Sequence, residues 1–94
     1  MAGRIAWSPR ALSDVEAIAE YIAADSATYA RNVVRKIITA TRILSRFPKA
    51  GRQVPEYQNP RVRELFAYSY RIIYKIEDEE VLIITVIHGK RNLS

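Results

Sequence analysis

The sequence predicts an α+β fold in which an N-terminal strand and an antiparallel helix hairpin pack on a small, mostly antiparallel sheet, in the order β-α-α-β-β-β. Apolar residues recur at helical spacing in the first half of the chain and alternate with a period of two in the last third. The chain has 94 residues, of which 49% are hydrophobic and 27% charged. That length and composition predict a single folded domain over residues 1–94.

The first elements are a short strand and a helix. Arg4 to Trp7 alternates weakly, which indicates a strand. Ser8 and Pro9 then form a helix start, with serine as the N-cap and proline at the first helical position. Ser13 and Glu16 have the spacing of a capping box, but the earlier signal places Ser13 inside the helix. The helix should end near Ala24, with an apolar face of Leu12, Val15, Ile18, Ala19 and Ile22.

A second, longer helix is expected from about Ala27 to Phe47, capped by Asp25-Ser26. Because the link between the two helices is so short, they should form an antiparallel hairpin. The apolar stripes of both helices are expected to pack in the core rather than to bind a partner. The stripe of the second helix is Ala30, Val33, Val34, Ile37, Ala40, Leu44 and Phe47, and Arg31, Arg35, Arg42 and Arg46 lie off it.

The segment from Pro48 to Pro60 contains prolines and a glycine that interrupt any regular period, which predicts a loop of about a dozen residues. Long loops in small domains often carry function, and Glu56 is the only acid in this one. Glu56 is a candidate general base. The alternative, which we favour, is a surface carboxylate paired with Arg52 or Arg61.

Three strands are expected in the last third, around Arg63, around Arg71, and from Val81 to His88. The last of these is apolar on both faces and should therefore lie inside the sheet. The acidic turn Glu77 to Glu80 should join the second and third of these strands as a hairpin. Alternation places Arg71, Ile73 and Lys75 on one face and Tyr70, Ile72, Tyr74 and Ile76 on the other.

The register of these strands decides whether their basic residues meet. With a two- or four-residue hairpin loop, Arg71 and His88 should be diagonal neighbours, and an odd loop would separate them. Arg63 joins them only if the turn near Ala67 and Tyr68 has an odd loop. An arginine within so apolar a strand favours a functional role for Arg71, whereas Arg63 and Lys75 fit a solubilising role equally well.

Positive charge is concentrated in the middle of the chain. The net charge is +5, but the segment from Arg31 to Lys75 holds eleven Lys and Arg against two acids, Glu56 and Glu64. Such a surface attracts phosphate backbones or an acidic protein, although solubility alone also explains it.

Several classes of function are excluded. There is no cysteine and only one histidine, so we expect no disulfide, no metal site and no cofactor. No signal peptide and no apolar run of membrane-spanning length occur, which predicts a cytoplasmic protein that does not bind membranes. Without a catalytic triad, P-loop or dinucleotide fingerprint, the remaining chemistry is acid–base work by Glu56 and His88 with arginines stabilising charge, or no catalysis.

The order of elements and motifs resembles the RelE/ParE superfamily of bacterial toxins along almost the whole chain. The matching motifs are Trp7-Ser8-Pro9-Arg10-Ala11-Leu12, Phe47-Pro48, Gly51-Arg52, Val54-Pro55-Glu56, Arg63-Glu64-Leu65, Tyr70-Arg71-Ile72-Ile73-Tyr74 and His88-Gly89-Lys90-Arg91. The resemblance implies the toxin of a type II toxin–antitoxin pair, neutralised by a cognate, ParD-like antitoxin in a hetero-oligomer. Operator DNA would then be bound only through the antitoxin.

Two targets follow from two branches of the superfamily. RelE-like and YoeB-like members cut messenger RNA on the ribosome, and for that branch the resemblance implies the catalytic set Glu56, Arg63, Arg71 and His88. ParE-like members inhibit DNA gyrase without cutting RNA. Gly89 stands where YoeB-like toxins have a tyrosine, and the chain lacks the C-terminal tyrosine and the lysine set of RelE-like toxins, so the ParE branch is favoured.

For either target, the residues expected to contact it are Arg63, Arg71, Lys75, His88, Lys90 and Arg91. A different class of function is a non-toxic module that uses its basic face to bind nucleic acid.

Overall fold

The computed structural model of the chain describes residues 3–91. It contains a first strand, two helices and four further strands, which confirms the predicted α+β class. One short strand, β2, was not expected. The elements are β1 (Arg4–Trp7), α1 (Pro9–Ala23), α2 (Ala27–Thr41), β2 (Arg52–Gln53), β3 (Val62–Ala67), β4 (Tyr70–Ile76) and β5 (Glu80–His88).

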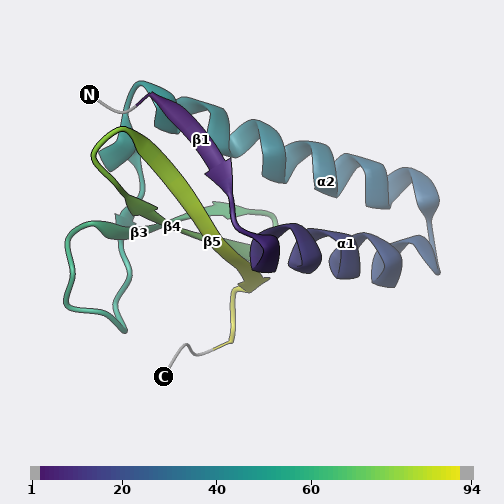
Figure 1. The fold of residues 1–94 in the computed structure, drawn as a ribbon. Helices are drawn as coiled ribbons and strands as arrows, with labels where there is room; N and C mark the ends of the chain where they lie inside the picture. The colour runs from purple at the N-terminus through teal and green to yellow at the C-terminus, as the bar shows by residue number, and fades with distance from the viewer. Residues whose placement is uncertain (1–2, 92–94) are drawn as a thin grey trace.

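The five strands form one sheet in the order β1-β5-β4-β3-β2. β1 runs parallel to β5, and every other neighbouring pair is antiparallel. The expectation that the last strand is internal is therefore confirmed. α1 and α2 lie side by side against the sheet, and their linked ends extend beyond it (Figure 1). No helix within residues 3–91 is long and apolar enough to cross a membrane.

Both helices begin where their local signals predicted. The Ser8 side chain accepts a hydrogen bond from the Ala11 backbone N–H at 3.0 Å, and the Ser26 side chain accepts one from Tyr29 at 3.1 Å. Each serine satisfies a backbone donor that has no partner within its helix. Ser13 lies inside α1, as expected.

Two predicted core positions are wrong. α2 ends at Thr41, followed by a 3₁₀ segment, Arg42–Ser45, rather than continuing to Phe47. A 3₁₀ segment has about three residues per turn instead of 3.6, so it rotates the chain out of the helical stripe. Leu44 stays buried, but Phe47 is 58% exposed. Leu12 is also 58% exposed, because Ala11 occupies the side of α1 that faces the sheet.

A β-bulge changes the pairing of β4 with β5. The acidic turn has a two-residue loop, since the Glu77 N–H donates to the Glu80 carbonyl at 2.9 Å. The register then shifts between Ile73 and Tyr74, so His88 pairs with Tyr70. One extra residue on a strand reverses which side chains share a face. Arg71 and His88 consequently lie on opposite faces, although the loop length alone would have made them neighbours.

Hydrogen bonds join α1 and its N-cap to β5 beyond the point at which β1 stops pairing with β5. The Ser8 hydroxyl donates to the Ile84 carbonyl at 2.8 Å, and the Val86 N–H donates to the Asp14 carboxylate at 3.0 Å. The Thr85 hydroxyl also donates to Asp14. These bonds satisfy backbone groups of β5 that β1 no longer reaches, and they fix the helix hairpin relative to the sheet.

Candidate functional site

Arg71 lies at the centre of a buried ionic network on the sheet face that points away from the helices. Only 5% of the residue is exposed. Its Nε donates to Glu64 Oε1 at 2.6 Å, and its two terminal nitrogens donate to the two Glu56 oxygens at 2.9 and 2.8 Å. Bidentate pairing of this kind fits the planar guanidinium closely. The arginine that stood out in an apolar strand is therefore the residue around which two acids gather.

The network continues through Glu64 to the edge of the sheet. The Glu64 side chain is fully buried, and its second oxygen accepts a hydrogen bond from Arg52 Nε at 2.6 Å. The Arg52 guanidinium lies over the Phe66 ring, 5.2 Å from its centre, as in a cation–π contact. We call Arg52, Glu56, Glu64 and Arg71 the ion network, and its two positive and two negative charges cancel.

The geometry keeps Arg71 charged. The hydrogen bonds to Glu56 raise the pKa of the guanidinium, burial opposes that rise, and Glu64 adds to it. The fold tolerates a charge this deeply buried because the carboxylate and carbonyl oxygens around it lie at hydrogen-bond distance from the guanidinium nitrogens. Arg71 therefore acts as a fixed cation and does not exchange protons.

The loop from Pro48 to Pro60 is held against the sheet by further contacts. Val54 packs with Val62 and Ile73 in a small apolar cluster. The Tyr74 hydroxyl donates to the Pro48 carbonyl at 2.6 Å and accepts from the Gly51 N–H at 2.9 Å. A side chain at Gly51 would meet the Glu64 carbonyl at 2.4 Å, so only glycine allows this approach. These contacts place Glu56 next to the Arg71 guanidinium.

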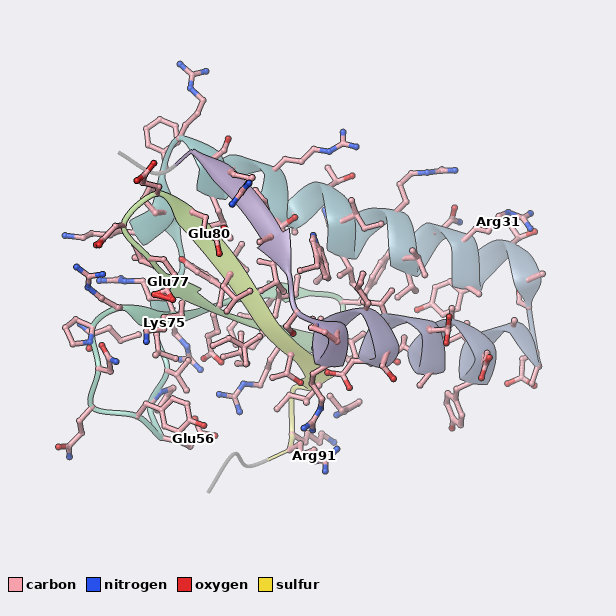
Figure 2. The ribbon with its side chains drawn as sticks, viewed as in Figure 1. Arg31, Glu56, Lys75, Glu77, Glu80 and Arg91 are labelled. Carbon is pink, nitrogen blue, oxygen red and sulfur yellow. The ribbon has the colours of Figure 1, made fainter. Side chains whose placement is uncertain are left out.

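The segment that follows β5 is fastened to the same network. Arg71 donates a further hydrogen bond to the Arg91 carbonyl at 2.9 Å. The Gly89 N–H donates to Ser69 at 2.6 Å, and the Arg91 N–H donates to the His88 carbonyl at 2.9 Å. Glu56 and Arg91 lie on the side of the sheet away from α2 (Figure 2). The described end of the chain, residues 88–91, is therefore a fixed turn.

The proposed four-residue nuclease set is not assembled at one place. Glu56 and Arg71 meet, but Arg63 pairs with Tyr74 across the strands and so lies on the helix side of the sheet. The β3–β4 turn has a two-residue loop, Tyr68 and Ser69, and not the odd loop that would have turned Arg63 toward Arg71. Arg63 instead donates to the Pro60 and Gly51 carbonyls, both at 2.9 Å.

Two expectations about individual residues need correction. Glu56 pairs with Arg71, not with Arg52 or Arg61, because the loop folds back over β4. His88 is exposed and packs edge-on against Tyr70, with ring centres 5.9 Å apart. It is separated from the ion network by the sheet.

The remaining basic candidates are scattered, and of them Lys90 and Arg91 are exposed while Lys75 is half-buried. The Lys75 Nζ atom lies 4.0 Å from Glu77 Oε2. Lys90 and Arg91 lie in the turn after β5. Arg31 is at the far end of the helix hairpin from Lys75 (Figure 2). The positive charge of the middle segment is thus spread over several faces and forms no single basic surface. Within residues 3–91, no group of three His, Asp or Glu side chains is placed to hold a metal ion.

Glu64 is a site residue that the sequence did not predict, and Arg52 was expected only as a possible partner of Glu56. The sequence does contain a sign of Glu64, because period-2 alternation places it on the same face as Val62 and Phe66 in the strand that precedes Arg71. An acid at such a position predicts a cross-strand cation on the same face. The partner could not be chosen among several arginines without the register.

A second feature is an apolar groove on the outer surface of the helix hairpin. Leu12 and Ile38 are 58% and 40% exposed along it. Arginines of α2 and of the segment after it, Arg31, Arg35 and Arg42, line it along the length of α2, and Glu16 and Glu20 of α1 line it as well. The apolar lining, which we call the hairpin groove, consists of Trp7, Leu12, Val15, Ala19, Val34 and Ile38.

Comparison with known proteins identifies the family. The family described as the ParE toxin of the type II toxin–antitoxin system parDE matches residues 5–93. The chain belongs to this family. The resemblance to the RelE/ParE superfamily seen in the motifs is therefore confirmed, and this ParE-family chain is the toxin component of a type II system.

Related proteins agree with this assignment. The chain is 36% identical over 86 residues to the putative toxin Y4kP of Sinorhizobium fredii, which covers 92% of this chain and 88% of that protein. It is 32% identical over 89 residues to toxin RelE2 of Caulobacter vibrioides, with 94% and 97% covered.

Two solved structures share the fold. A chain of the chromosomal ParDE system from P. aeruginosa matches with a TM-score of 0.78 at 20% identity, covering 94% of this chain and 97% of that one. The YoeB dimer from Staphylococcus aureus matches with a TM-score of 0.66 at 16% identity, covering 94% and 98%. At these identities, the likeness concerns the fold.

Proposed function

We propose that this ParE-family toxin arrests growth by inhibiting DNA gyrase and that it does not cut RNA. The observation that carries the proposal is the state of Glu56 and Arg71. Two hydrogen bonds join the Glu56 carboxylate to the Arg71 guanidinium, so each group already has a partner. The other two members of the nuclease set, Arg63 and His88, lie across the sheet. A general base must lie within hydrogen-bond reach of the proton that it removes, and a general acid within reach of the leaving group of the same substrate, which this arrangement does not favour.

The contact with the target is proposed at the turn after β5. His88, Lys90 and Arg91 are exposed there, and the bond from Arg71 to the Arg91 carbonyl holds the turn in place. Arg71 then serves the target contact as a positioning residue, since too little of it is exposed to touch gyrase directly.

The antitoxin is proposed to bind the hairpin groove with an amphipathic segment. The groove offers exposed apolar side chains, and the arginines along α2 complement an acidic partner. Arg31 is one of them and points outward from the hairpin (Figure 2). Apolar contact would supply the affinity, and charge would steer the approach.

Gyrase supercoiling in the presence of the purified chain tests the target. The chain should block supercoiling or trap cleaved DNA, and addition of its antitoxin should restore supercoiling. His88→Ala and Lys90→Ala should weaken inhibition, while Lys49→Ala, which removes an exposed cation elsewhere, should not. Full gyrase activity with a folded, growth-arresting chain would overturn the proposal.

A further inference from the structure

A surface with a different chemistry lies beside α2 and shares Arg35 with the hairpin groove. The exposed rings of Tyr29 and Tyr68 meet there edge to face, with centres 6.1 Å apart and an angle of 71° between their planes. Tyr68 also lines a shallow hollow with residues of α2, namely Asn32, Arg35, Lys36 and Thr39. We call these six residues the tyrosine patch.

The backbone of Tyr68 is unusual for its side chain. Tyr68 is the first residue of the two-residue β3–β4 turn and has φ 53°, the only positive φ of a non-glycine residue within residues 3–91. Glycine is the favoured residue where a tight hairpin turn begins with positive φ. A ring kept at such a position, with 55% of the residue exposed, contributes less through burial than a core aromatic side chain does. Residues held in this region often serve a binding role.

The cations of the patch lie in a part of the sequence that contains no acid. Between Asp25 and Glu56 the chain contains no acid and seven Lys and Arg residues. Arg35 and Lys36 form no ion pair with any residue in the described range 3–91. Uncompensated cations of this kind favour an anionic ligand. Asn32 and Thr39 add side-chain hydrogen-bonding groups to the hollow.

We propose that the tyrosine patch binds single-stranded nucleic acid, with bases stacked on Tyr68 and Tyr29 and phosphates held by Arg35 and Lys36. Exposed aromatic rings beside cations are the combination by which proteins hold single strands without reading sequence. Duplex DNA, whose bases are stacked on one another, cannot use the rings. An acidic protein segment would satisfy the cations but has no need of two exposed tyrosine rings. The apolar hairpin groove suits a protein partner better.

Binding of fluorescently labelled oligonucleotides to the purified full chain tests this inference. Single-stranded DNA, single-stranded RNA of the same sequence and duplex DNA serve as probes, and anisotropy is read at several salt concentrations. Either single strand should bind more tightly than the duplex, and the preferred strand names the biological ligand. Equal binding of single strands and duplex would overturn the proposal.

Tyr68→Gly is the decisive variant, because glycine suits the positive φ and the loss of the ring should leave the fold intact. It should weaken single-strand binding about tenfold, the order of one lost stacking contact. Lys36→Gln should lower the salt dependence of the binding constant by about 0.7 in slope, the value for one phosphate contact on a single strand.

Matched controls are available elsewhere on the chain. Tyr57→Gly removes another exposed tyrosine, and Lys49→Gln another exposed lysine. Neither should change oligonucleotide affinity by more than about twofold. If the patch variants and the controls behave alike, or if Tyr68→Gly weakens only antitoxin binding, the inference is wrong. The measurement uses neither gyrase nor growth arrest, so its outcome is independent of the proposed target.

Discussion

At the scale of single residues, the role of Arg71 follows from the groups to which it donates hydrogen bonds and not from the small part of it that is exposed. One guanidinium joins Glu64 of the neighbouring strand, Glu56 of the loop and the Arg91 carbonyl of the final turn. Three segments distant in sequence are therefore fixed to β4 by one side chain. Arg71 accordingly links the stability of the fold to the position of the residues proposed to meet gyrase.

Removing that side chain should be costly. Arg71→Ala leaves Glu64 fully buried and Glu56 mostly buried, paired with fewer charges. Breaking a buried ion pair from one side costs about 3–5 kcal/mol, so urea unfolding should show a loss of that size. Lys75→Ala is the control on the same strand, since its pair with Glu77 is half exposed, and it should cost no more than about 1 kcal/mol. Equal effects of the two variants would contradict the role given to Arg71.

At the scale of elements, Tyr74 ties β4 to the loop that carries Glu56. Burial raises the pKa of Tyr74, and the hydrogen bond from Gly51 opposes that rise. A raised pKa means that the folded state keeps its proton above pH 10, the ordinary tyrosine value, while the unfolded state loses it. The stabilising contribution is therefore complete below about pH 10 and declines as the pH rises toward the folded-state pKa.

Tyr74→Phe should reveal this contribution. Loss of the hydroxyl leaves the Gly51 N–H and the Pro48 carbonyl without their partner and should cost about 1–3 kcal/mol at neutral pH. The fall in unfolding free energy above pH 10 should also become shallower. Tyr57→Phe, at an exposed position, should change neither quantity. An unchanged alkaline slope in Tyr74→Phe would refute the assignment.

The helix hairpin gives the second prediction at this scale. Ile38→Glu places a charge in the hairpin groove and should weaken antitoxin binding at least tenfold, about the loss expected at a central interface position. Ile43→Glu makes the same change at a similarly exposed isoleucine outside the groove lining and should have little effect. Calorimetric titration measures both. Wild-type affinity should also fall as salt is raised, and a salt-independent affinity would exclude the arginines from the interface.

Local signals predicted the elements well but not their mutual placement. Ser8 and Ser26 begin their helices because a cap acts on the next few backbone groups, which the sequence displays directly. The separation of Arg71 from His88 depends on one inserted residue in β5, and no local pattern marks that bulge. Glu56 was assigned to the wrong arginine for a similar reason, because the loop's path over β4 follows from tertiary contacts of Val54, Gly51 and Tyr74.

At the scale of the whole molecule, the two faces of the sheet are occupied differently. The helix hairpin covers one face and offers its outer groove to a partner, while the loop and the ion network cover the other. The exposed turn after β5 lies at one end of the sheet. An antitoxin in the hairpin groove and a target at that turn could thus act through separate surfaces.

Induction of the gene with and without its antitoxin tests the molecule as a unit. The toxin alone should arrest growth, and cells should show DNA damage with intact messages on their ribosomes, because Arg63 and His88 lie across the sheet from Glu56 and Arg71. Glu56→Gln keeps the size of the side chain but removes its charge, so it should act only through stability and spare arrest wherever the protein remains folded. A ribosome-dependent nuclease would instead lose about a hundredfold or more of its activity. Codon-phased 5′ ends inside translated messages, abolished by Glu56→Gln, would replace the gyrase mechanism with cleavage.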